Sequence, residues 1–168
     1  MDALAQRLTR WVADSDVQAH DKALRRVRSG VPPAALAAFL AAARAHPDAR
    51  YTPVLLDATR YRKVSVRGQA LAALACMGPA HAERAIALAA GDHDFTIRRL
   101  AWALERLHPS PTSHEVIAAL LERDTELAEA LATAYGPVTQ TEATDADLDA
   151  EIVIFDADDD DDDDAERP

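Results

Sequence analysis

The chain has 168 residues, of which 38 are alanine, 8 are aromatic and 5 are glycine, and because alanine is the best helix former this composition excludes an all-β fold and predicts an all-α one. The single cysteine, Cys76, excludes an internal disulfide framework, and no apolar run is long enough to cross a membrane. The net charge of −11 is uneven: residues 1–136 carry +2 and residues 137–168 carry −13.

Apolar residues recur with helical spacing along residues 1–136, and breaking or capping residues separate the periodic segments. Asp94 and Asp124 stand where a side-chain oxygen caps the following helix. Thr112 and Glu115 have the spacing of a capping box. Gly30 and Gly136 stand where a left-handed residue ends a helix. These signals predict nine helices, at residues 2–13, 16–29, 32–46, 53–62, 64–77, 80–90, 94–107, 113–123 and 124–136.

Residues 137–168 differ in composition from the rest of the chain. They contain 14 acidic residues and one arginine, including seven consecutive aspartates from Asp158 to Asp164. Mutual repulsion and the scarcity of apolar area oppose a packed structure, so we predict a disordered acidic tail. Its apolar island, made of Ile152, Val153, Ile154 and Phe155, is a candidate motif for forming a short strand against a partner.

The second half of the helical region contains an internal repeat. The sequence Val66-Arg67-x-x-Ala70 returns as Ile97-Arg98-x-x-Ala101, and an apolar helix follows each copy. A third, decayed copy begins at Asp124 and lacks the arginine. Repeated helix pairs that cannot bury their apolar faces alone are stabilised by stacking. We therefore expect residues 1–136 to form an α-solenoid of antiparallel helix pairs.

This pattern resembles the HEAT repeat, in the short form seen in HEAT-like repeats of the phycobilisome-lyase type. The match covers residues 53–135, roughly half of the chain. In such repeats a turn aspartate and an arginine that opens the next helix commonly form a ladder between neighbours. The resemblance implies that role for Asp92 or Asp94 with Arg67 and Arg98. It also implies that the third copy is a terminal, capping repeat.

Two basic groups are candidate binding residues. On a helical wheel Trp102 lies beside Arg99 and Arg106, which suggests either an anchor for a partner or packing against the adjacent repeat. Arg60, Arg62 and Lys63, with Arg67 after them, have the charge to neutralise phosphates. The net charge of +2 on residues 1–136 is small for a nucleic-acid binder, so direct nucleic-acid binding is disfavoured.

No catalytic or cofactor motif is complete. His114-Glu115 begins like a zinc-protease helix, but the second histidine is missing. The segment 92–94 has the composition of a small metal loop, yet its two aspartates are better explained as caps or ladder partners. Cys76 stands among small apolar residues, which favours a buried spacer over a nucleophile. We expect no enzymatic activity, no metal and no cofactor.

These features predict a non-enzymatic, cytoplasmic, monomeric scaffold that binds a protein partner on the inner face of the stack, through alternate helices such as 64–77 and 94–107. The acidic tail has three interpretations: a solubilising extension, an internal competitor for the basic groups, or the ligand itself. Two alternative functions remain open. One is an inhibitor or immunity-type protein that neutralises a basic enzyme through its tail, and the other is a nucleic-acid-binding or repair protein that uses the arginine-rich face.

Overall fold

The computed structural model describes residues 2–14 and 16–135. Over these two ranges the secondary structure consists of nine α-helices and one 3-10 turn, with no strand, which confirms the all-α prediction. The elements are α1 (Ala3–Ala13), α2 (Val17–Arg28), α3 (Pro33–Ala45), η1 (Ala49–Tyr51), α4 (Thr52–Ala58), α5 (Val64–Ala75), α6 (Pro79–Ala90), α7 (Phe95–Leu107), α8 (Pro111–Arg123) and α9 (Thr125–Tyr135).

Three predicted helix boundaries have the local structure that was expected of them. Asp94 accepts hydrogen bonds from the amides of Thr96 and Ile97, and Asp124 accepts one from the amide of Leu127. Gly30 follows α2 with a φ of +90°, the left-handed conformation that glycine adopts at low cost. Gly136, the other predicted left-handed residue, lies outside the described residues.

Two boundaries differ from the prediction. The helix expected at 53–62 ends at Ala58, because the amides of Arg60 and Tyr61 bond three residues back instead of four and the chain turns. The capping box predicted at Thr112 and Glu115 is wrong. Helix α8 begins at Pro111, where no amide is needed, and Ser110 and Ser113 bond each other's amides in a capping box.

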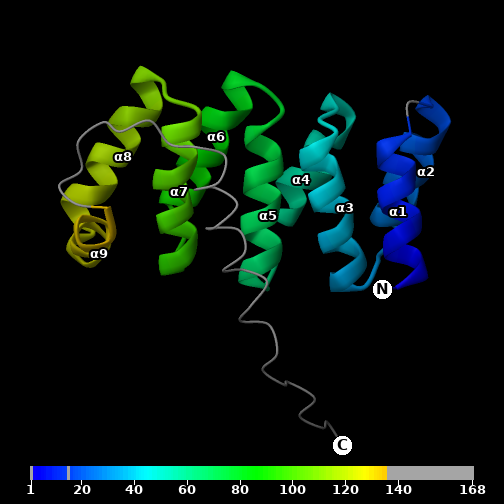
Figure 1. Ribbon diagram of the computed structural model, residues 1–168, viewed down its shortest axis with the longest axis horizontal. Helices are drawn as coiled ribbons and strands as arrows, with labels where there is room; N and C mark the ends of the chain where they lie inside the picture. Colours follow the sequence, from blue (N-terminus) through cyan, green and yellow to red (C-terminus); the bar gives the residue numbers. More distant parts are fainter. Residues whose placement is uncertain (1, 15, 136–168) are drawn as a thin grey trace, which may run out of the picture.

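The helices lie in two rows (Figure 1). The front row contains α1, α3, α5 and α7, and each of these packs on the next. The rear row contains α2, α4, α6 and α8, with contacts between α2 and α4 and between α6 and α8. Helix α9 closes one end of the molecule by packing on α7 and α8.

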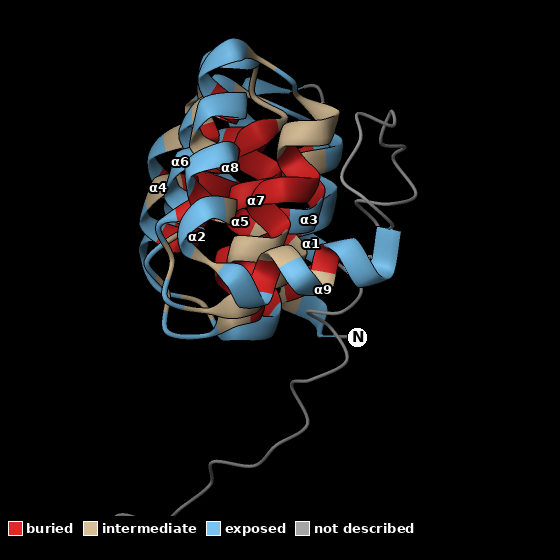
Figure 2. Ribbon diagram, turned by 90° about the vertical axis from the view of Figure 1, so that its left-hand side faces the viewer, coloured by how far each residue is buried: buried red, intermediate tan, exposed pale blue. Residues whose placement is uncertain are grey.

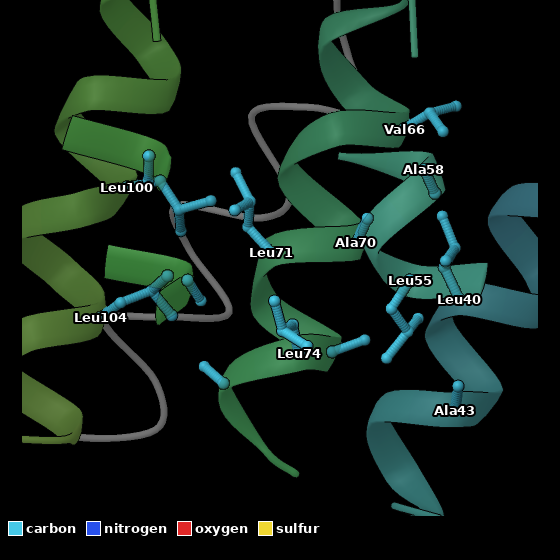
Figure 3. Close-up of a cluster of buried hydrophobic side chains, with 14 of the residues drawn as sticks. Leu40, Ala43, Leu55, Ala58, Val66, Ala70, Leu71, Leu74, Leu100 and Leu104 are labelled. Carbon is cyan, nitrogen blue, oxygen red and sulfur yellow. The ribbon is translucent and has the colours of Figure 1, made fainter. Parts of the chain in front are cut away.

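One continuous cluster of buried apolar side chains runs through all of the described α-helices, which therefore share one core (Figure 2). Leu71 and Leu74 of α5 lie at its centre, between Leu100 and Leu104 of α7 on one side and Leu40 of α3 on the other (Figure 3). Each fully buried leucine contributes about 1.5–3 kcal/mol to the stability of the fold. Buried alanines fill many of the remaining helix contacts and let the two rows approach closely.

No described helix is long and apolar enough to cross a membrane. The predicted disordered tail at 137–168, with Ile152, Val153, Ile154 and Phe155, lies outside the described residues.

Candidate functional site

An arginine–aspartate pair joins two of the helical repeats. Near the start of α5, the Arg67 Nε and Nη2 atoms donate to the two carboxylate oxygens of Asp92, at 3.0 and 3.1 Å. Its Nη1 atom donates to the carbonyls of Tyr61 and Arg62, at 3.1 and 3.0 Å. The Arg67 side chain is only 6% exposed, so the bidentate pair and the carbonyls compensate a buried charge.

The same arrangement recurs at the next repeat. The Arg98 Nε atom lies 2.5 Å from an Asp124 carboxylate oxygen, and its Nη1 donates to the carbonyls of His93 and Asp92 at 2.7 and 3.4 Å. The hydrogen bond from Arg98 lowers the pKa of the Asp124 carboxyl below its ordinary value. Both arginines therefore bond the two carbonyls at equivalent positions before them and an aspartate one repeat ahead.

We call the Arg67–Asp92 and Arg98–Asp124 pairs the ladder. Arg67, which the sequence suggested as part of a partner surface, is held by this ladder. This residue is 5% exposed, and its donors are directed at Asp92 and at two backbone carbonyls. A partner docking on the outside would have to break a buried ion pair to reach it. The structure thus gives Arg67 a supporting position inside the repeat, in contrast to the accessible position that we expected.

The aspartates of segment 92–94 have structural partners. Besides binding Arg67, Asp92 accepts a hydrogen bond from the amide of Asp94, and Asp94 caps α7. Within the described ranges no group of three or more His, Cys, Asp and Glu side chains could hold a metal ion. Cys76, which we expected to be a buried spacer, has intermediate burial and lies at the end of α5.

Four side chains of α7 and α9 come together in what we name the α7–α9 cluster: Arg99, Trp102, Arg106 and Tyr135. The Arg106 guanidinium carbon lies 4.6 Å from the centroid of the Trp102 ring system. The rings of Trp102 and Tyr135 are 4.8 Å apart, and the Arg99 Nη2 atom lies 3.3 Å from the Tyr135 hydroxyl. The spacing of the α7 residues, three and four apart, puts all three on one helix face.

Trp102 itself is packed. Its side chain is only 4% exposed, which agrees with the packing interpretation and leaves little ring surface for a partner. The outer part of the cluster is formed by Arg99 and Arg106, both of intermediate exposure, and by Tyr135, which is 42% exposed. Sequence reasoning missed Tyr135. An aromatic residue beside the predicted helix end at Gly136 was a possible signal, but its packing on α7 depends on how α9 folds back.

Arg60, Arg62 and Lys63 occupy a different place, on the connection between α4 and α5. All three are exposed, whereas the α7–α9 cluster is built from helix faces. The backbone of this connection is held by Arg67 through the carbonyl of Arg62. The structure therefore separates the predicted binding residues into two surface groups and one buried residue.

A second buried polar group, missed by sequence reasoning, joins α2 to η1. The His20 Nδ1 atom is hydrogen-bonded to the Tyr51 hydroxyl, and the two rings stack with centroids 5.5 Å apart. Burial raises the pKa of Tyr51 to about 12. The hydrogen bond from Arg50 lowers the pKa of Asp48 to about 2, although burial of the carboxyl partly opposes it. A hollow of about 380 Å³, lined in part by His20, Asp14 and His46, borders this group. The His20 and Tyr51 side chains are buried and their polar atoms bond each other, so we assign the pair to stability.

Comparison with known proteins found no protein-family model, no curated protein and no solved structure that matches this chain. The functional argument therefore depends on the residues and contacts described above.

Proposed function

We propose that this chain is a HEAT-like α-solenoid of antiparallel helix pairs that acts as a non-enzymatic scaffold for binding a partner protein. The observation that carries the proposal is the repeated ladder, in which Arg67 and Arg98 bond equivalent carbonyls and an aspartate one repeat ahead. A ladder of this kind fixes the rotation between neighbouring repeats. It gives a rigid surface, which reduces the entropy lost on binding.

The partner surface in this proposal is the α7–α9 cluster, where α9 packs on the last helix of the front row. Arginine and tyrosine are enriched in binding hot spots because they combine apolar area with hydrogen-bond donors. Arg106 is held against Trp102 and Arg99 against Tyr135, so both guanidiniums are partly ordered before a partner arrives. Such a surface suits a protein segment that presents carboxylates or backbone carbonyls. The cytoplasmic location and the monomeric state remain predictions.

The test is partner capture followed by a binding measurement with full-length protein. The variant Arg99→Gln with Arg106→Gln removes both outer charges but keeps the packed Trp102. Arg84→Gln, on the exposed side of α6 in the rear row, is the control for loss of an arginine elsewhere on the surface. We expect the double variant to bind the captured partner at least tenfold more weakly and the control to bind normally. Equal affinity for the double variant and the wild type would reject this surface.

An inhibitor or immunity-type role is the second candidate, because 14 acidic residues lie within 137–168. Replacing Asp158–Asp164 by asparagine in the full chain separates the two functions. If the partner is a basic enzyme whose inhibition disappears in this variant but survives Arg99→Gln with Arg106→Gln, the inhibitor role is correct and the scaffold proposal fails.

A further inference from the structure

A group of basic side chains lies along one edge of the molecule, and we name it the basic edge: Arg25, Arg28, Arg60, Arg62 and Lys63. All five are exposed. The first two belong to the last turn of α2, and the other three form the connection between α4 and α5. Helices α2 and α4 pack on each other, and α3 and α5, which follow them, both begin at the lower edge of Figure 1.

Few acidic residues lie in the sequence around this edge, and the nearest along the chain are Asp21, four residues before Arg25, and Asp57, three residues before Arg60. Residues 22–47 and residues 58–82 contain no aspartate or glutamate. Among the described residues, Arg25, Arg28, Arg60 and Arg62 form no ion pair, whereas Arg50, Arg67 and Arg98 all have carboxylate partners. The four arginines of the basic edge therefore carry positive charge that the described part of the chain leaves uncompensated.

The chain itself carries the complementary charge. Residues 137–168 have a net charge of −13, and the described chain ends at Tyr135, whose hydroxyl lies 3.3 Å from Arg99 of α7. A flexible segment of this length has a root-mean-square reach of about 30 Å. Two helix spacings of about 8–10 Å separate α7 from α3 in the front row, so the edge lies within that reach. We propose that the acid run Asp158–Asp164 docks on the basic edge of the same molecule.

Tethering favours this occupant over an external polyanion. A segment linked to its site by a short flexible chain reaches millimolar effective concentration. A nucleic acid in solution competes with it only by binding more tightly or by being present at a higher concentration. The attraction is between exposed charges, so it is weak and is screened by salt. The docked acid run neutralises the edge until a stronger acidic ligand displaces it. This docking uses residues outside the α7–α9 cluster, so its test is independent of the test of the proposed partner surface.

Paramagnetic relaxation measured on the full chain tests the docking. A nitroxide on Ala165→Cys, in a Cys76→Ala background, puts the probe beside the acid run without removing a charge. At about 20 mM salt we expect the amide signals of residues 25–28 and 60–63 to weaken. Signals of Gly78 and Ser110 at the opposite edge should be retained. Near 1 M salt, where the Debye length is about 3 Å, we expect the weakened signals to recover.

Paired variants show whether the named arginines are responsible. Arg25→Gln with Arg28→Gln, and Arg60→Gln with Arg62→Gln, should each restore at least half of the lost intensity. Arg7→Gln with Arg10→Gln removes the same charge from exposed positions of α1 and should restore none. Restoration by the α1 pair, or by neither edge pair, overturns the proposal. If Cys76→Ala perturbs the fold, amide shifts of the unlabelled wild type compared with the Asp158–Asp164 asparagine variant give the same map.

Two other occupants are separate outcomes. Broadening that grows with protein concentration, in mixtures of labelled and isotope-enriched chains, would indicate a second copy and overturn intramolecular docking. A DNA duplex of about 20 base pairs, added to the intact chain at about 150 mM salt, is expected to leave the edge signals unchanged. Tight, salt-dependent binding of the duplex through the same arginines would instead make the edge a nucleic-acid surface.

Discussion

Arg67 and Arg98 have the same set of partners in successive repeats. Each guanidinium bonds two carbonyls of the turn before its own helix. Each also forms an ion pair with an aspartate that follows the next helix, Asp92 after α6 or Asp124 after α8. Both aspartates also accept a backbone amide, from Asp94 and Leu127 respectively. The ladder thus ties the packing between repeats to the start of the next helix.

The first prediction concerns the more deeply buried of the two ion pairs, between Arg67 and Asp92. Asp92→Ala leaves the Arg67 charge buried without its carboxylate and removes the acceptor for the amide of Asp94. Loss of one partner from a buried ion pair typically costs about 3–5 kcal/mol, and we expect a loss at the lower end of that range in the free energy of unfolding. Equilibrium denaturation by urea measures it.

The control for this change is Asp21→Ala. The Asp21 side chain is 54% exposed and lies 4.0 Å from Arg50, so its removal should leave the free energy of unfolding nearly unchanged. Similar losses in the two variants would mean that the ladder does not contribute specifically to stability.

The sequence predicted the features that depend on residues close together in the chain, such as the helices, several of their caps and the repeat. The spacing of the repeat placed Arg67 and Arg98 at equivalent positions because the offset between the copies is visible in the chain itself. What failed depends on tertiary neighbours. The helical wheel showed which face of α7 holds Trp102, but not that Tyr135 of α9 packs on the ring. The early end of α4 likewise accompanies a turn whose carbonyls bond Arg67, a contact that sequence spacing does not reveal.

The second prediction distinguishes packing from binding at Trp102. Because the ring is 4% exposed and packs against Tyr135, Trp102→Ala should lower the free energy of unfolding by about 3–5 kcal/mol. Arg106→Ala removes a partly exposed cation–π contact, whose loss should cost less than about 1 kcal/mol. Thermal and urea unfolding of both variants check this. A fully stable Trp102→Ala variant would contradict the packing interpretation and favour Trp102 as a direct anchor for a partner.

The third prediction is a pH dependence at Asp48. Its pKa is about 2 in the folded protein, below the ordinary value of 3.8, chiefly because Arg50 donates hydrogen bonds to it. The stability from this pair is therefore present above about pH 4 and is lost as the pH falls toward 2. Asp48→Asn should be less stable than the wild type near pH 6, by up to about 1 kcal/mol, with the difference vanishing near pH 2. Urea midpoints across this range measure it, and a difference independent of pH would contradict the assignment.

The fourth prediction uses the glycine between α5 and α6. Gly78 has φ +123° and ψ 170°, a region that is almost exclusive to glycine, and an added Cβ would meet nothing within 4 Å. Any cost of Gly78→Ala therefore comes from the backbone alone, and we expect a loss of about 1–3 kcal/mol in the free energy of unfolding.

Gly91, at the end of α6, is the control glycine, with φ −88° and room for a Cβ at ordinary contact distances. Gly91→Ala should be neutral or stabilising by up to about 1 kcal/mol, through the smaller entropy of its unfolded chain. Denaturant unfolding of both variants checks this, and a destabilised Gly91→Ala with an unaffected Gly78→Ala would reverse the assignment of the strained position.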